Sequence, residues 1–271
     1  MRILIIADIE GVCGVSHPDE TRLGQPGYER ARKLMTREVN CLVQGALDGG
    51  ARDVWVVDSH GTYRNILIED LHPDAHLIAG RPRLDGMTAG LATHGPWHGV
   101  FLSGCHARAS SYGVLAHTIN SRAFASVNVD GKDVGEAFLN SALAGALEIP
   151  VRLVSGDDNV AREVASFLPE AEVVTVKQAL GNSAAIHLPL TLAHEALHDS
   201  AIQAMQGDKA PLHVSMPAWV EVRTVLPVLA DLFSLVPGVQ RLSATTVAFE
   251  AESAQMLVRM LNAFSAMSSS A

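Results

Sequence analysis

The chain of 271 residues is 48% apolar and 18% charged, which provides a large hydrophobic core and excludes a disordered or fibrous protein. Its formal net charge of -9, with no run of Lys or Arg, argues against a nucleic-acid partner, because such proteins concentrate basic residues on one surface. No stretch approaches the roughly 20 apolar residues that span a bilayer, so we expect no membrane partner.

The N-terminal half is predicted to alternate strands and helices. Residues 2–7 form a short, β-branched apolar run, typical of a strand that is buried on both faces. A helix is expected at 28–49, followed by strands at 54–57 and 100–102. Right-handed crossovers between such strands make a parallel sheet whose carboxyl ends lie at one edge.

The second half begins with a hairpin signal, Asp130-Gly131, between apolar residues 124–129 and Val134. Helices are expected at 135–146 and 161–167, on either side of a strand at 151–154. After about residue 187 the predicted order is a helix (192–206), two strands (218–225 and 245–251) and a last helix (252–267). We therefore predict an α/β fold: a largely parallel central sheet with flanking helices at 1–186, the metal-binding catalytic domain, and a smaller α+β portion at 187–271.

The three cysteines are odd in number and widely spaced, at positions 13, 41 and 105. They form neither a disulfide framework nor a paired-cysteine zinc motif, which favours a reducing compartment. Asp8 and Glu10 interrupt the first apolar run, so it does not have the pattern of an export signal. We expect a cytoplasmic protein.

Four predicted strands end in residue types that bind metals. In chain order these are Asp8 and Glu10, then Asp58 and His60, then His106, then Asp157 and Asp158. Taken singly, each is more often a capping or solvated side chain. Open parallel sheets, however, bind ligands beyond the carboxyl ends of their strands, and Glu136 at the corner between hairpin and helix can close over that edge.

The candidate ligands are three carboxylates (Asp8, Glu10 and Glu136) and two imidazoles (His60 and His106). Their negative charge is one unit smaller than the positive charge of two divalent cations. A bridging hydroxide can balance the remaining unit. Mixed oxygen and nitrogen ligands favour zinc, with Mn²⁺ or Co²⁺ as possible substitutes. The residues thus predict a two-metal hydrolytic centre.

Two further residues are given supporting roles. His117 follows His106 in a loop that contains Gly113, which could fold the second histidine over the first as an acid–base group; a hydrogen-bonded surface histidine is the alternative. Asp58 is expected to orient His60 from behind, as metal-bound imidazoles generally require.

Several motifs together resemble one family over nearly the whole chain. They are Asp8-Ile9-Glu10-Gly11, Tyr28-Glu29-Arg30, Asp58-Ser59-His60, the segment 104–109, Gly135-Glu136, Asn140, Gly156-Asp157-Asp158, 176–178 and 245–249. In order and spacing they are similar to the zinc-dependent D-aminopeptidases of bacterial dipeptide-transport operons. Cys105 departs from the pattern, because the family commonly has an aromatic residue there.

The resemblance implies a binuclear zinc aminopeptidase that removes an N-terminal residue, often D-configured such as D-Ala, from short peptides or amides. It also implies a homodecameric ring around an enclosed channel, to which we assign residues 187–271. By position the ligands would be Asp8, Glu10, His60, His106 and Glu136, with His117 as the catalytic histidine. We expect a metal-bound hydroxide to attack the scissile carbonyl, with Asp8 between the two ions.

Two alternatives remain open at this stage. A phosphatase of the haloacid-dehalogenase type also begins with an apolar strand and an Asp-x-Asp-Gly motif, which 8–11 approximates with Asp8 as nucleophile and magnesium as cofactor. The other is a non-catalytic, metal-stabilised peptide-binding subunit. Metal analysis combined with peptidase assays separates both from the enzyme.

Overall fold

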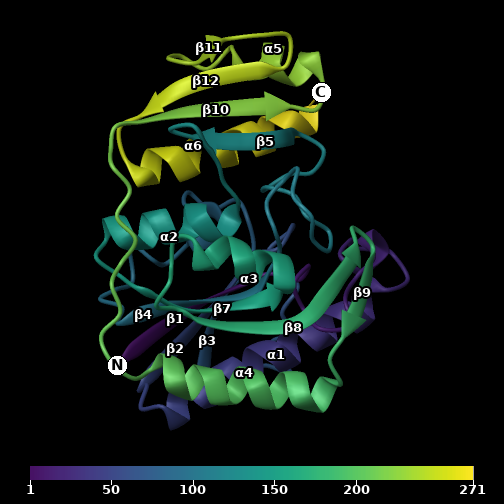
Figure 1. The fold of residues 1–271 in the computed structure, drawn as a ribbon, viewed down its shortest axis with the longest axis vertical. Coiled ribbons are helices and arrows are strands. Elements are labelled where there is room, and N and C mark those ends of the chain that lie inside the picture. Colours follow the sequence, from purple (N-terminus) through teal and green to yellow (C-terminus); the bar gives the residue numbers. More distant parts are fainter. Residues whose placement is uncertain (271) are drawn as a thin grey trace.

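The computed structural model describes residues 1–270, which form two stacked sheet layers (Figure 1). The larger sheet has seven strands in the order β3-β2-β1-β4-β7-β8-β9, all parallel except β9. Its strands are β1 (Arg2–Ala7), β2 (Asp53–Asp58), β3 (Ala75–Ile78), β4 (Gly99–Cys105), β7 (Val151–Asp157), β8 (Glu172–Gly181) and β9 (Ala184–His187). The predicted α/β class with a largely parallel sheet is confirmed.

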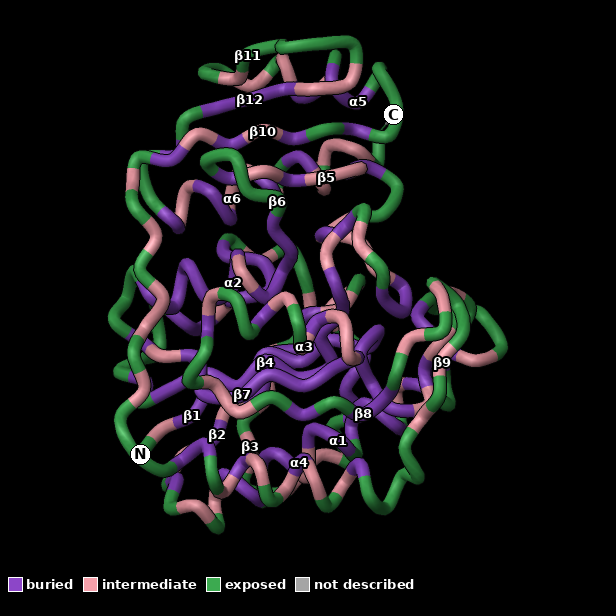
Figure 2. The backbone as a smooth tube through the Cα atoms, in the orientation of Figure 1, coloured by how far each residue is buried: buried purple, intermediate pink, exposed green. Residues whose placement is uncertain are grey.

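Helices cover both faces of this sheet. Figure 1 shows α1 (Tyr28–Asp48) and α4 (Leu190–Ala204) below it, and α2 (Glu136–Ala146) and α3 (Asp158–Ala165) above it. Alternate residues of β1 enter different cores: Ile3 and Ile5 pack toward α1, whereas Leu4 and Ile6 pack toward α2. The central strands are therefore buried throughout, as Figure 2 shows for β4 and β7, which explains their uninterrupted apolar sequences.

The smaller layer is an antiparallel sheet in the order β11-β12-β10-β5-β6. Its strands are β5 (Phe124–Val129), β6 (Lys132–Asp133), β10 (Ala218–Thr224), β11 (Gln240–Arg241) and β12 (Thr246–Ala251). Helices α5 (Pro227–Phe233) and α6 (Ala254–Met267) complete this layer around Phe264, which stacks on Phe233 at 4.4 Å between ring centroids. Three short 3-10 helices are η1 (Pro18–Glu20), η2 (Gly86–Thr88) and η3 (Ser268–Ser270).

The two layers divide the chain differently from the expected 1–186 and 187–271 portions. The hairpin β5–β6 was expected in the first portion, but it pairs with β10, where Val127 lies opposite Val222. Conversely, α4 lies after residue 187 yet packs on α1 beneath the larger sheet (Figure 1). Both differences arise because strand pairing and helix packing join segments that are distant in sequence.

Sequence periodicity also left some elements unidentified, namely β3, β8, β9, α5 and β11. Strands at a sheet edge are short or partly exposed and lack the apolar runs of the centre. No helix among residues 1–270 is both long and apolar enough to cross a membrane.

Candidate metal centre

The carboxyl ends of β1, β2 and β4 lie level at one edge of the larger sheet. Ala7 is in register with Asp58 on one side and with Ser103 on the other. The chain can turn this tightly after β4 because Gly104 has φ +67°, and a Cβ there would lie 2.1 Å from the Asp8 carbonyl oxygen. This close approach places Asp8 and His106 side by side.

The carboxylate of Asp8 lies between two imidazoles. Its Oδ1 is 3.0 Å from His60 Nδ1, and its Oδ2 is 3.4 Å from His106 Nε2. Glu10 reaches the first imidazole as well, with Oε2 2.9 Å from His60 Nδ1. Asp8 is thus shared between two groups of potential ligands.

Glu136 completes the second group from the first turn of α2. Its Oε1 lies 3.3 Å from His106 Nε2 and 3.8 Å from His117 Nε2, and it accepts a hydrogen bond from the Ile119 backbone N–H at 2.5 Å. The rings of His106 and His117 are stacked, with centroids 4.0 Å apart. The structure therefore folds the second histidine over the first, as the glycine-containing loop predicted.

Each of the three imidazoles is oriented by a backbone carbonyl. The pairs are His60 Nε2 with Thr21 O at 2.7 Å, His106 Nδ1 with Ala107 O at 3.0 Å, and His117 Nδ1 with Leu115 O at 2.9 Å. A carbonyl only accepts, so these ring nitrogens carry the proton in the neutral form. The opposite nitrogen of each ring, which faces the carboxylates, is left with its lone pair, as in metal-bound histidines.

The electrostatics of the cluster favour added positive charge. Burial opposes ionisation of Asp8, yet the neighbouring imidazoles of His106 and His60 hold the pKa of its carboxyl well below the ordinary value. Burial likewise disfavours charged imidazoles, but Glu10 and Asp8 raise the pKa of His60 well above its usual value, and Glu136 and Asp8 do the same for His106.

The donor set fits divalent metal ions. Two groups bring one ligand atom per residue within 4.8 Å of one another: Asp8, Glu10 and His60, and then His106, His117 and Glu136. Glu10 Oε2 and His106 Nε2 are buried and make no hydrogen bond, so each has a coordination position to offer. Imidazole and carboxylate are ligands that zinc accepts.

The segment that carries Glu10 is held by two buried charged residues that the site prediction did not include. Lys177 in β8 donates from Nζ to the carbonyls of Glu10, Val12 and Val15. Glu38 in α1 accepts from the Cys13 N–H at 2.7 Å. Burial raises the pKa of Glu38 to about 7 and lowers that of Lys177 to about 8. The available signal was a lysine in a strand position directly after the buried Val176 and three residues after the buried Val174.

Asp58 does not orient His60 in the way that was expected. Its carboxylate accepts hydrogen bonds from the backbone and side chain of Asn65 and from the Ile66 N–H, while the Thr21 carbonyl binds the His60 ring. Asn65 Nδ2 also donates to the His60 carbonyl at 2.6 Å. Asp58 therefore shapes the loop that carries His60 and does not contact its imidazole.

Asp157 and Asp158 also lie outside the cluster. Asp157 Oδ1 caps α3 by accepting from the N–H groups of Asn159 and Val160, and Asp158 Oδ1 accepts from the Ala179 N–H. Because α3 begins immediately after β7, its unpaired first-turn N–H groups engage the carboxylate that the strand end supplies. The metal-binding expectation for this fourth strand end is not met.

A cavity of about 1080 Å³ opens at the centre and is lined by residues of both layers. Asp8, Glu10, His60, His117 and Glu136 lie in its wall. The smaller layer contributes the opposite wall through residues such as Leu229 of α5 and Asn262 and Ser265 of α6. The five predicted ligands and His117 are thus gathered at one site that a small molecule can enter.

Comparisons with known proteins agree with this geometry. Residues 1–263 match the model of the M55 peptidase family, described as D-aminopeptidase. A D-aminopeptidase of Bacillus subtilis (strain 168) is 33% identical over 278 aligned positions, which cover 98% of this chain and 95% of the relative.

A solved structure is similar over its whole length. It is a zinc-dependent D-aminopeptidase from Bacillus subtilis, described as a self-compartmentalizing protease, with a TM-score of 0.95 and 28% identity, covering 100% of this chain and 99% of the other. The resemblance seen in the sequence motifs is confirmed: this chain belongs to the M55 D-aminopeptidase family of peptidases.

Proposed function

We propose that this protein is a binuclear zinc aminopeptidase that removes an N-terminal D-amino acid, such as D-Ala, from short peptides or amides. The observation that carries the two-metal centre is the position of Asp8, whose two oxygens face different imidazoles. Asp8, Glu10 and His60 would hold one ion, and Asp8, His106 and Glu136 the other. Zinc, when bound, acts as a Lewis acid toward the scissile carbonyl and makes water more acidic.

His117 is proposed to move the proton that the leaving amine needs. Its Nδ1 is held by the Leu115 carbonyl, so Nε2 is presented toward Glu136 and the cavity. The side chain is 18% exposed, whereas that of His106 is 1% exposed. Access to the cavity suits a group that exchanges protons with substrate better than one that only supports the fold.

The family relationship also supports an assembly proposal. The similar structure from Bacillus subtilis is described as self-compartmentalizing, and we propose that this chain likewise forms a homodecamer, with residues 187–271 contributing to the channel. A cytoplasmic location is proposed from the three cysteines, which are free thiols in the structure. Light scattering on the purified protein tests the oligomeric state.

The activity is tested by following release of the N-terminal residue from matched D-Ala and L-Ala amides and dipeptides. The zinc-loaded protein should cleave the D substrates, lose activity on chelation and regain it when zinc is added back, with about two zinc ions per chain by elemental analysis. Preference for L substrates would refute the D specificity. Intact metal without turnover would favour the peptide-binding alternative. No observation favours the phosphatase alternative, because both oxygens of Asp8 face imidazoles.

A further inference from the structure

The cavity wall outside the metal centre is strongly cationic. Four arginines contribute to it, Arg22, Arg81, Arg83 and Arg122, whereas Asp8, Glu10 and Glu136 are the only acidic residues of the lining among residues 1–270. The chain as a whole has a formal net charge of -9. Positive charge is therefore concentrated where a substrate would enter, against the trend of the molecule.

Three of these guanidinium groups have no partner within the described chain. The side chains of Arg22, Arg81 and Arg122 are exposed and make no ion pair or hydrogen bond with residues 1–270. Two arginines on the adjacent helix α1 are paired, Arg30 with Glu20 at 3.0 Å and Arg32 with Glu29 at 3.5 Å. Exposed arginines elsewhere, such as Arg37 and Arg52, also lack a partner among the described residues, so what distinguishes Arg22, Arg81 and Arg122 is their place together in the cavity wall.

Arg83 adds a fixed charge to the same wall. Its Nη1 and Nη2 donate to the carbonyls of Ile78 and Asp58, at 3.2 and 2.6 Å, and its guanidinium lies 3.9 Å from the centroid of the Tyr63 ring. Carbonyls and a ring face hold a cation in place without neutralising it. The field of Arg83 therefore acts on whatever anion occupies the cavity.

We infer that the cavity selects short peptides with a free C-terminal carboxylate, which Arg22, Arg81 and Arg122 bind while the N-terminal residue lies at the metal centre. The inference rests on the proposed aminopeptidase function and specifies its substrate class. Guanidinium groups bind carboxylates through paired, charge-assisted hydrogen bonds. An extended peptide spans about 3.5 Å per residue, so a carboxylate site at a set distance from the centre also limits peptide length.

The test compares substrates that differ only at the C-terminus. D-Ala-Gly and D-Ala-Gly-Gly are assayed beside their C-terminal amides with the zinc-loaded protein. The free acids should be favoured in kcat/KM by about tenfold to a hundredfold, mainly through KM, which is the effect expected of a charge-assisted hydrogen bond. Added salt should raise KM for the acids more than for the amides. Equal kcat/KM for acid and amide would overturn the inference.

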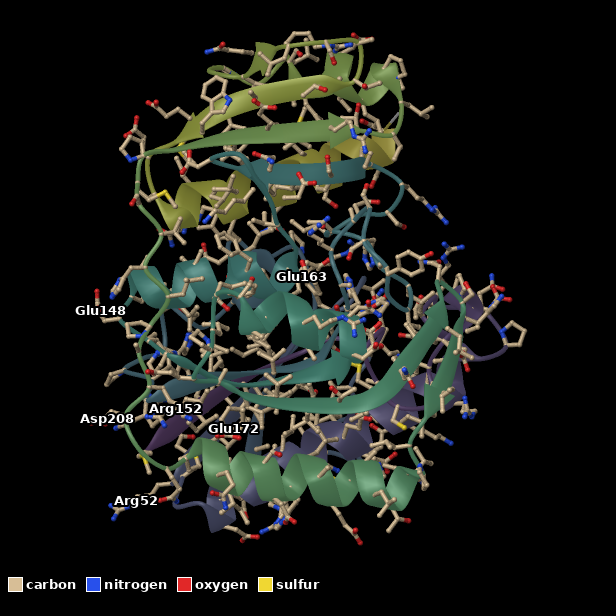
Figure 3. All side chains as sticks on the ribbon, viewed as in Figure 1. Arg52, Glu148, Arg152, Glu163, Glu172 and Asp208 are labelled. Atoms are coloured by element: carbon tan, nitrogen blue, oxygen red, sulfur yellow. The ribbon has the colours of Figure 1, made fainter. Side chains whose placement is uncertain are left out.

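Variants locate the effect. Arg22→Gln, Arg81→Gln, Arg122→Gln and their combination should lower the preference for acids toward unity, by raising KM for the acids more than for the amides. Arg52→Gln is the matched control, because Arg52 is exposed and precedes β2 at the opposite edge of the sheet (Figure 3). A preference that survives in the combined variant would refute the assignment. Selection of amidated peptides with acidic side chains over the free acids would also overturn it.

Failure of the proposed function gives a different result from failure of this inference. If the protein cleaves none of these peptides, the same acid and amide pairs are titrated into it by calorimetry. Tighter binding of the acids, lost in the combined variant, would support the carboxylate site without peptidase activity. Equal binding of acids and amides would reject it.

Discussion

Replacement of the buried Lys177 by Met tests whether this lysine holds the segment that carries Glu10. Its Nζ donates to the carbonyls of Glu10, Val12 and Val15, and no sulfur or methyl group can replace those bonds. A hydrogen bond to a charged group contributes about 1.5 to 3 kcal/mol. Burial lowers the pKa of Lys177 from 10.5 to about 8, equivalent to a cost of about 3 kcal/mol for holding the charge inside.

Three such bonds outweigh that cost, so Lys177→Met should lose about 2 to 5 kcal/mol of unfolding free energy. For a chain of this size the corresponding fall in Tm is about 5 to 15 °C. The variant should also bind zinc more weakly, because Glu10 lies in the segment whose carbonyls Lys177 binds. Calorimetric unfolding and elemental analysis measure the two effects.

Lys209→Met is the matched control. Lys209 Nζ lies 3.3 Å from Glu172 Oε1 in a pair that is partly exposed, and such pairs contribute less than about 1 kcal/mol. It should leave Tm and zinc content nearly unchanged. A Lys177→Met protein that matches the wild type in both measurements would refute the positioning role.

Three further predictions follow from individual contacts. Burial raises the pKa of Glu38 from 4.5 to about 7. The folded state therefore binds the carboxyl proton of Glu38 more tightly than the unfolded state does. This protonation contributes about 3 kcal/mol to the free energy of unfolding below pH 4.5, and the contribution is lost as pH rises to about 7. Glu38→Gln keeps an acceptor for the Cys13 N–H, so urea unfolding at pH 5 and pH 7.5 should show less loss of stability than in the wild type; an identical pH dependence would contradict the assignment. His117→Ala should lower kcat by about a hundredfold to ten-thousandfold with zinc content intact, whereas loss of zinc by elemental analysis would make His117 a ligand. In Gly104→Ala the new Cβ would meet the Asp8 carbonyl oxygen at 2.1 Å, so we expect a loss of at least about 3 kcal/mol by chemical denaturation, and a normal denaturation midpoint would show that the turn can relax.

Much of the fold and of the candidate site could be predicted because its signals are local. The β-branched run at 2–7 and the apolar stripe of α1 depend on neighbouring residues, and the crossover rule then places Asp8, His60 and His106 at one edge. The Asp130-Gly131 hairpin and the helix that begins at Glu136 were predicted for the same reason.

The predictions that differed from the structure concern contacts between distant segments. Asp58 was assigned to His60 by proximity in sequence, yet the ring is bound by the Thr21 carbonyl from a different loop. Asp157 could bind a metal or cap a helix. Because α3 begins immediately after β7, Asp157 caps the helix. Lys177 supports the site because β8 brings its Nζ to the carbonyls of the segment that follows β1.

The sequence by itself determined the fold class, the family and the residue types available to the metal centre. Only the tertiary structure decided that Asp8 lies between two imidazoles, that β5 joins the second sheet, and that unpaired arginines surround the cavity. The physical reason is that hydrophobic periodicity and turn chemistry act over a few residues and are written in the chain. Ligand geometry and cavity charge depend on packing between segments whose spacing in the sequence does not determine their distance in space.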